Sequence, residues 1–307
     1  MATDKSIFSL FPDSVELMKW CNNQPNKSFP EINGHIHTPH SFSAFESIEQ
    51  AFLLAKAEGV SVLGINDFYT TDGYDEFADL AVKHNVFPLF NIELMALQSH
   101  LQEAGVRVND PSNPGRTYFS GKGLRQPASM SKASFEKIKN LQVESNRQTY
   151  EMVDKLNQFM AGIGVGIVFD APALHKRLAK NLFRERHIAQ AIRIGVFSFY
   201  EDEADRKRIL QKIFSGKEVK SVLENIAALE NEIRGNLLKS GGAAFVPEDP
   251  KAFLSLEEVI DLIIDAGGIP CYPVLLDDPK GVCTDYEADK EKLLEELLKN
   301  DVYSIEL

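Results

Sequence analysis

The run SVLGINDFYTTDGYDEFADLAVKHNVFPLFNIELMAL (residues 61–97) contains two apolar segments on either side of an amphipathic one. Residues 61–67 and 86–97 are short, apolar and bounded by turn-forming residues, so we predict buried strands there. Residues 72–84 have the periodicity of a helix that buries one face. A strand, a helix and a strand at this spacing predict a right-handed parallel βαβ unit.

The same alternation continues on both sides of this run. Residues 32–37 are predicted to form a strand, and residues 47–58 a helix that ends before Gly59. Near the end of the chain, Ser255 and Glu258 have the spacing of a capping box at the start of a helix. A strand, a helix and a last strand are predicted after it, at residues 269–276, 289–300 and 302–307.

The middle of the chain has a different character. Residues 99–129 are polar and rich in turn-forming residues, and residues 131–239 are dominated by helical periodicity. We therefore expect a discontinuous α/β domain, formed by residues 1–98 and 245–307, that is interrupted by a loop and a helical insertion over residues 99–244.

Composition excludes several classes of protein. The 307 residues include 33 Lys and Arg against 45 Asp and Glu, a formal net charge of −12. Such a surface repels phosphate backbones and anionic lipids, so we expect no broad nucleic-acid binding. Three widely spaced cysteines do not make a disulfide framework, and we find neither a signal peptide nor an apolar run that could span a bilayer. We expect a cytoplasmic protein without a membrane segment.

Histidines stand at the end of the first predicted strand, in GHIHTPHSFSAF (34–45). Alternate side chains of a strand face the same way, so His35 and His37 are expected to point into one pocket, where two imidazoles suit Zn, Mn or Fe. His40 follows three residues later, in the loop. The alternative is that these are partly buried histidines beside a turn.

Two carboxylates lie on the next two predicted strands. Asp67 ends the strand at 61–67, and Glu93 is surrounded by apolar residues within the strand at 86–97. Because a buried carboxylate is costly unless it is paired or binds a metal, Glu93 favours a site. Asp67 is either a neighbour of a helix N-cap or a site residue. We expect both to lie with His35 and His37 at the carboxyl ends of successive strands, where the functional groups of such sheets gather.

Basic residues that could bind a phosphate lie in the middle of the chain. Lys122 is part of the Gly-flanked segment SGKG (120–123), which lacks the spacing of a P-loop. Arg184, Arg186 and His187 cluster at the start of a predicted helix, whose N-terminus favours anions. The alternative for this cluster is a solvated basic turn.

Taken together, the HxHT motif with its following Ser, the strand that ends in Asp, the strand with an internal Glu and the late helix–Gly-Gly–strand–Pro element resemble the PHP (polymerase and histidinol phosphatase) superfamily. The matching segments are residues 30–97 and 250–307. The resemblance implies a distorted seven-stranded, TIM-like (β/α) barrel and a metal-dependent phosphoesterase with two or three ions. RERHIAQAI (184–192) is similar to a branch whose helical insertion covers the barrel mouth, a branch that includes nucleotide phosphatases.

The sequence also departs from the family pattern. Aromatic residues replace three family histidines, at Phe68, at Tyr272 in Cys-Tyr-Pro and near Tyr118. The last family ligands, an Asp-x-His, would lie beyond Leu307. The resemblance therefore implies one divalent ion (Zn, Mn, Fe or Mg) rather than three, in a degenerate site.

We thus expect a phosphoesterase that acts on a small phosphorylated molecule or a nucleotide. His35, His37 and Glu93 would bind the ion, with Asp67 as a further ligand or proton acceptor. The residues expected to contact the phosphorylated substrate are Lys122, Arg184, Arg186, His187, Tyr272 and His40. The alternative is a catalytically depleted module that binds a phosphorylated or nucleotide ligand. Because the last strand leaves an open sheet edge, we also expect a homo-oligomer or a further C-terminal domain that completes the barrel.

Overall fold

The computed structural model describes residues 6–23, 30–43, 45–275 and 283–307. Contacts divide the chain into two compact units. Unit 1 comprises Met1–Lys139 and Phe253–Leu307, and unit 2 comprises Asn140–Ala252. Unit 1 is thus discontinuous in sequence, whereas unit 2 is one continuous segment.

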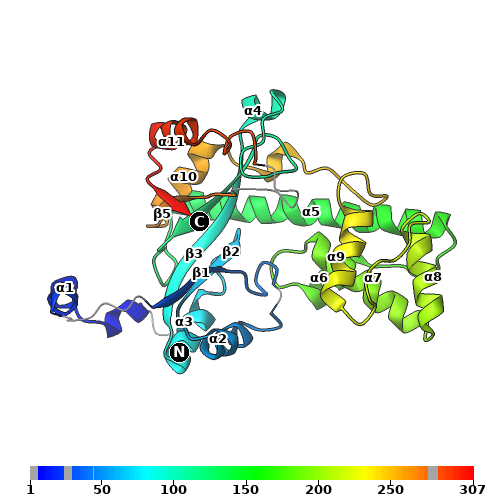
Figure 1. The fold of residues 1–307 in the computed structure, drawn as a ribbon, viewed down its shortest axis with the longest axis horizontal. Coiled ribbons are helices and arrows are strands. Elements are labelled where there is room, and N and C mark those ends of the chain that lie inside the picture. The colour runs from blue at the N-terminus through cyan, green and yellow to red at the C-terminus, as the bar shows by residue number, and fades with distance from the viewer. Residues whose placement is uncertain (1–5, 24–29, 44, 276–282) are drawn as a thin grey trace. The chain divides into compact units, whose positions relative to one another are not determined.

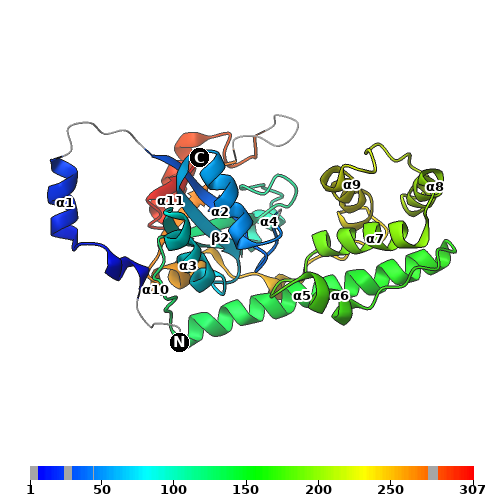
Figure 2. The ribbon, with the colours of Figure 1, turned by 90° about the horizontal axis from the view of Figure 1, so that it is seen from below.

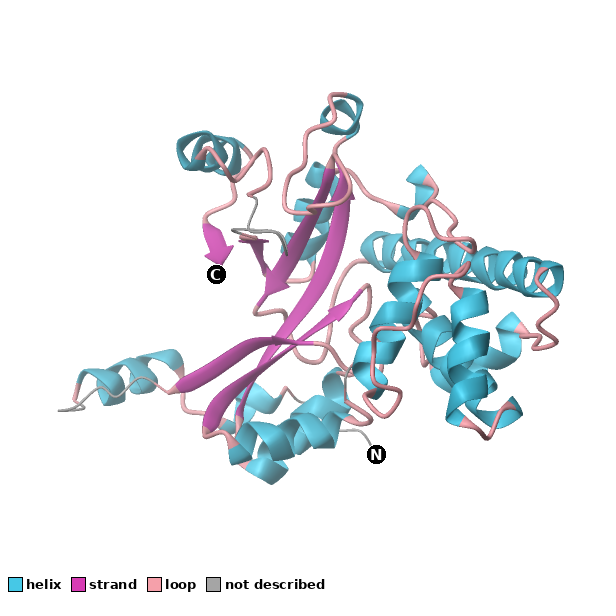
Figure 3. Cartoon of the chain, turned by 45° about the vertical axis from the view of Figure 1, so that its right-hand side comes forward, coloured by secondary structure: helices cyan, strands magenta, loops and turns pink. Residues whose placement is uncertain are grey.

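Unit 1 is built on a single curled sheet of six strands, in the order β1-β2-β3-β4-β5-β6 (Figures 1 and 3). The strands are β1 (Glu31–Ile36), β2 (Val60–Phe68), β3 (Phe87–Leu97), β4 (Arg116–Lys122), β5 (Ile269–Pro273) and β6 (Ser304–Glu306). The first three are parallel to one another, β4 is antiparallel to both of its neighbours, and β5 and β6 are again parallel. The predicted α/β class and the parallel arrangement of the first three strands are confirmed.

Strand β4 differs from the sequence-based expectation, because we predicted residues 99–129 to be loop. Its sequence, RTYFSGK, combines the strand formers Thr, Tyr and Phe with Gly and Lys, which are depleted in strands. Pairing on both sides compensates for this weakness, since β4 bonds to β3 along one edge and to β5 along the other. As a result, residues 99–139, which we had assigned to the insertion, belong to unit 1.

Helices with well-formed ends cover the sheet. Ser47 caps α2 (Ile48–Ala57) by accepting a hydrogen bond from Gln50 N, and Ser255 and Glu258 form the predicted capping box of α10 (Leu256–Asp265). Helix α2 lies beside α3 (Tyr74–His84) in Figure 2, and α10 packs against β3, β4 and β5. The other helices of unit 1 are η1 (Ile7–Leu10), α1 (Ser14–Asn22), α4 (Ser99–Glu103), α11 (Lys290–Lys299) and the first part of α5 (Lys132–Gly162).

The core beneath α2 and α3 is aromatic. The rings of Phe52 and Phe77 lie 4.7 Å apart, and those of Tyr74 and Phe90 lie 5.0 Å apart. All four side chains are fully buried. These interactions hold β2 and β3, the strands that carry two of the predicted site carboxylates.

In unit 2, the described elements are all helical and surround a separate apolar core. They are the remainder of α5, α6 (Ala171–Leu178), α7 (Glu185–Phe199), α8 (Glu203–Ile213), α9 (Ile226–Ile233), η2 (Arg234–Leu238) and η3 (Pro250–Ala252). Leu156, Ile188 and Leu229 are among the fully buried residues of this core. Across the described ranges, no helix has both the length and the apolar character that a membrane crossing requires.

We expect the capping box of α10 to contribute to the stability of the protein. Replacing Ser255 by Ala leaves Glu258 N without its hydrogen-bond acceptor, so we expect Ser255→Ala to lower the free energy of unfolding by about 1 kcal/mol. Urea denaturation measures this change. Ser255→Asp retains a capping oxygen and should lose much less, and equal losses in the two variants would contradict the capping role.

Candidate metal centre

A bulge in β1 sets the position of the first histidine. The pairing of β1 with β2 is irregular between Asn33 and Ile36, where β1 contains one residue more than its partner. Side chains bind the backbone groups that the bulge releases: Asn33 Oδ1 accepts a hydrogen bond from His35 N (3.2 Å), and Asn91 Nδ2 donates one to Gly34 O (3.0 Å). The short motif NGHIH therefore folds into a fixed geometry that presents His35 and His37.

Three of the predicted ligands converge. His35, His37 and Glu93 each offer one ligand atom, and these atoms lie within 4.8 Å of one another. Glu93 Oε2 is 3.2 Å from Nε2 of His37 and 3.8 Å from Nε2 of His35. Two imidazole nitrogens and a carboxylate oxygen in this arrangement can bind one divalent ion.

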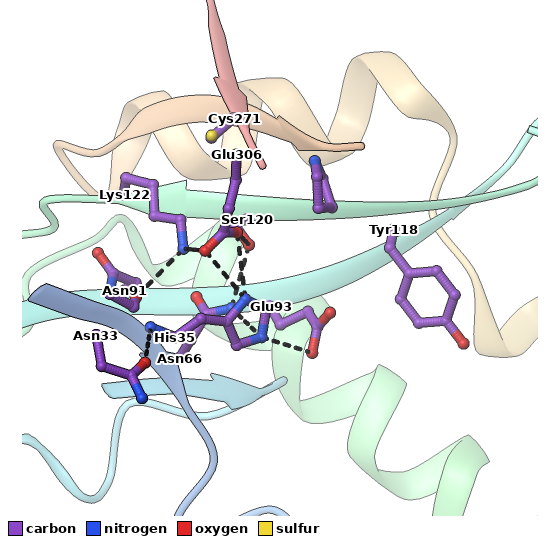
Figure 4. Close-up of polar contacts among 12 residues, drawn as sticks. Asn33, His35, Asn66, Asn91, Glu93, Tyr118, Ser120, Lys122, Cys271 and Glu306 are labelled. Carbon is purple, nitrogen blue, oxygen red and sulfur yellow. Dashed lines mark hydrogen bonds and ion pairs between the residues drawn. The ribbon is translucent and has the colours of Figure 1, made fainter. Parts of the chain in front are cut away.

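The two imidazoles are held in different ways. The ring of His37 stacks on Phe42, with centroids 4.4 Å apart, and its Nδ1 is buried with no hydrogen-bond partner among the described residues. His35, in contrast, has polar contacts on both ring nitrogens (Figure 4). Its Nδ1 faces the carboxylate of Glu306 at 3.2 Å, and its Nε2 faces Nδ2 of Asn66 at 2.9 Å.

Burial and charge act in opposite directions on these groups. Burial alone would lower the pKa of His35, but hydrogen bonds to Glu306 and Glu93 outweigh it and raise the pKa to about 9. Burial likewise favours neutral Glu93, yet His35 and His37 hold its pKa below the usual value. For Glu306, His35 and Lys122 overcome burial and lower the pKa to about 2. Without a metal, the centre is therefore an ion-pair cluster at neutral pH.

The protonation state of His35 determines how Asn66 can face it. A doubly protonated imidazole donates from both nitrogens, so Asn66 can bond to Nε2 only through its Oδ1. In the structure Nδ2 of Asn66 faces the ring instead. In that orientation the buried Oδ1 has no hydrogen-bond partner among the described residues. The amide can therefore donate from Nδ2 to neutral His35, or accept through Oδ1 from protonated His35 after a flip of its side chain.

Asp67 lies in a different set of contacts. Its carboxylate accepts hydrogen bonds from Thr38 N (2.6 Å), Thr38 Oγ1 (2.5 Å) and Ser41 Oγ (2.6 Å). Burial raises its pKa, and these donors partly offset that effect. The structure does not bring Asp67 into the group of convergent ligand atoms, and its contacts instead fix the loop after β1.

Three predicted substrate-binding residues of unit 1 have partners within the fold. Lys122 ends β4 and forms an ion pair with Glu306 (2.8 Å). Tyr272 is buried and donates a hydrogen bond to Glu287 (3.1 Å), and His40 Nε2 lies 3.9 Å from the carboxylate of Glu76. Their roles in substrate binding stay predictions.

The basic cluster at the start of α7 belongs to unit 2. Arg184 donates to Ser145 Oγ (2.8 Å), and its backbone N–H donates to Nδ1 of His187 (3.0 Å). Burial lowers the pKa of His187 to about 4 and also lowers the pKa of Arg186, which lies near Arg234. Arg184 and His187 are partly buried, whereas Arg186 is exposed, as expected for a solvated turn. Their binding of phosphate stays a prediction.

Sequence reasoning missed Glu306, Asn66 and Ser120. Ser120 Oγ accepts a hydrogen bond from Asn66 Nδ2 (3.1 Å) and lies 3.4 Å from Glu306, so it links these two residues. Glu306 lies at the carboxyl end of the predicted last strand. A carboxylate at that position could have indicated a site residue from the sequence. Asn66 and Ser120 are ordinary polar residues, and no local pattern marks them.

Aromatic side chains occupy the positions where the resemblance implies further histidines. Phe68 and Tyr118 meet edge to face with ring centroids 6.1 Å apart, and Phe68 also lies 6.2 Å from Phe42, the residue on which His37 stacks. Phe42, Phe68 and Tyr118 therefore form an aromatic cluster next to His37.

Comparison with known proteins gives structural neighbours. No protein-family model matches the sequence, and no curated protein matches it. A solved structure from Bifidobacterium adolescentis, assigned as a metal-dependent phosphoesterase, is similar with a TM-score of 0.58 and 16% identity, over 92% of this chain and 78% of its own. An amidohydrolase from Chromobacterium violaceum, solved with sulfate and no metal, is similar with a TM-score of 0.53 and 15% identity, over 90% of this chain and 76% of its own.

The fold is similar to the folds of a metal-dependent phosphoesterase and an amidohydrolase. The resemblance predicted from the motifs is thereby confirmed for the fold. The metal centre rests on the geometry of this chain's own residues.

The raised pKa of His35 predicts proton release when the centre binds a metal. Below about pH 9 the metal-free His35 is protonated, and a cation can bind Nε2 only after the proton leaves. We expect about one proton released per Zn²⁺ at pH 7.5, and an affinity that rises with pH until about pH 9. Calorimetric titration in two buffers of different ionisation enthalpy measures the release. Binding without proton release would contradict the protonation state assigned to His35.

Proposed function

We propose that this protein is a metal-dependent phosphoesterase that hydrolyses a small phosphorylated substrate with one divalent ion. The observation that carries the proposal is the convergence of His35, His37 and Glu93 within 4.8 Å. The similarity of the fold to a phosphoesterase and an amidohydrolase supports a hydrolytic reaction. On this proposal the six strands form part of a seven-stranded (β/α) barrel.

The donor set fits a transition metal. Nitrogen ligands from two imidazoles suit Zn²⁺, Mn²⁺ or Fe²⁺, whereas Mg²⁺ prefers oxygen ligands alone. His37 has its unpartnered Nδ1 on the far side of the ring from Glu93, so its Nε2 is the atom that faces the carboxylate. The aromatic residues Phe68 and Tyr118 cannot replace imidazole as ligands, which supports one ion rather than two or three.

When bound, a divalent ion supplies Lewis-acid activation of water and of the phosphoryl group. The chain's own residues perform the remaining tasks. Glu93 stays ionised because its pKa lies below the usual value, so it can bind a cation at neutral pH. Lys122 is half-buried beside the centre and offers a positive charge to an anionic substrate. Arg184 and Arg186 belong to unit 2, and their binding of phosphate stays a separate prediction.

Hydrolysis of p-nitrophenyl phosphate with added Mn²⁺ or Zn²⁺ tests the proposal. We expect turnover by the wild-type protein and a loss of at least about 100-fold in the His35→Ala/His37→Ala variant. A bound metal stabilises the transition state by several kcal/mol, and losing that stabilisation slows the reaction by more than this factor. His100→Ala replaces an exposed histidine of α4 and should retain full activity.

Equal rates in the wild type and the double variant would reject the proposal. Thermal stabilisation by a phosphorylated ligand without any turnover would instead support the alternative, a catalytically depleted binding module. Measuring both turnover and stabilisation on the same preparations therefore separates the two functions.

A further inference from the structure

Glu306 links the last strand of the sheet to the first. It lies on β6, yet both of its carboxylate oxygens are 3.2 Å from Nδ1 of His35 on β1 (Figure 4). The other ring nitrogen of His35, Nε2, is the atom that faces Glu93. The carboxylate thus contacts His35 on the nitrogen that is directed away from the convergent ligand atoms.

Glu306 is itself held in place. Lys122 Nζ donates to its Oε1 at 2.8 Å, and Ser120 Oγ lies 3.4 Å from its Oε2. The amine of Lys122 also lies 3.4 Å from Gly34 O, in the bulge of β1. Contacts from β4 therefore fix both the carboxylate and the backbone next to His35.

A histidine that binds a metal through one nitrogen generally donates its other N–H to a carboxylate or a carbonyl. That hydrogen bond sets the tautomer and the ring orientation, and it makes the ligand nitrogen more basic. His37 provides the contrast within the same centre, because its Nδ1 has no hydrogen-bond partner among the described residues. The centre therefore contains one imidazole whose Nδ1 contacts a carboxylate, that of His35, and one whose Nδ1 does not, that of His37.

We propose that Glu306 is a positioning residue for metal binding: it accepts the Nδ1–H of His35 and so directs Nε2 of His35 to the ion. This inference rests on the proposed function, since it assigns a role around the same ion. It adds a residue that makes no contact with the metal and that acts through His35. Lys122 and Ser120 act one step further out, by orienting Glu306.

The test compares zinc affinity in four forms of the full chain, by competition with a chromophoric chelator. Glu306→Ala removes the acceptor and should weaken Zn²⁺ binding about 10–100-fold. Glu306→Gln keeps an oxygen that can accept the hydrogen bond but lacks the charge, so its loss should lie at or below the lower end of that range, about 10-fold or less, and be smaller than that of Glu306→Ala. The Gln variant has nearly the same shape as the native residue, which keeps the test usable if Glu306→Ala does not fold.

Glu49→Gln is a matched control. Glu49 also bridges a lysine and a histidine, with Lys83 Nζ at 2.5 Å and His84 Nε2 at 3.2 Å, but neither belongs to the convergent ligands. Its zinc affinity should stay within about twofold of the wild type.

A spectroscopic measurement separates positioning from general destabilisation. In zinc-loaded protein with ¹⁵N-labelled histidine, long-range ¹H–¹⁵N spectra should show His35 as the Nδ1–H tautomer, with an Nδ1–H signal protected from exchange in the wild type and in Glu49→Gln. Glu306→Ala should lose that protection.

The outcomes distinguish this inference from the proposed function. Wild-type protein that binds no zinc would overturn both. Wild-type binding that is matched by both Glu306 variants, with an unchanged His35 tautomer, would overturn the positioning role alone and leave the metal centre in place.

Discussion

The carboxylate of Glu93 is the constraint on which the site depends. Its side chain is buried in β3 among apolar residues, and a buried carboxylate is costly without compensating charge. The imidazoles of His35 and His37 both contact it, because a bulge and strand alternation direct both toward β3, and protonated His35 supplies a compensating charge. Thus the sheet, the bulge and the order of the first three strands all serve to pair one acidic group with two histidines.

The same pairing allows the centre to exist in two states. Without a metal, protonated His35 and Lys122 balance the carboxylates of Glu93 and Glu306, two positive charges against two negative ones. A divalent cation that displaces the proton of His35 leaves these partners in place and binds the nitrogen that the proton occupied. The protein can therefore fold around a stable ion-pair cluster that already has the geometry of a metal site.

Local features of the sequence were enough to predict His35, His37 and Glu93. Strand alternation places the two histidines on one face, and the cost of burying a carboxylate singles out Glu93. The other features depend on contacts between distant segments. Strand β4 is stable because two strands flank it, and Glu306 acts through a residue 271 positions earlier in the sequence. Asp67 illustrates the same dependence on contacts, because its carboxylate accepts hydrogen bonds from hydroxyl groups of the loop after β1, and its role as a ligand or proton acceptor stays a prediction.

The most direct measurement is anomalous diffraction from a crystal of the wild-type protein soaked in Mn²⁺. We expect one strong peak about 2.0–2.3 Å from Nε2 of His35, Nε2 of His37 and a carboxylate oxygen of Glu93, the range of metal–ligand bonds at such sites. An absent peak, or a peak that none of these three atoms can reach, would contradict the assignment of this cluster as a metal centre.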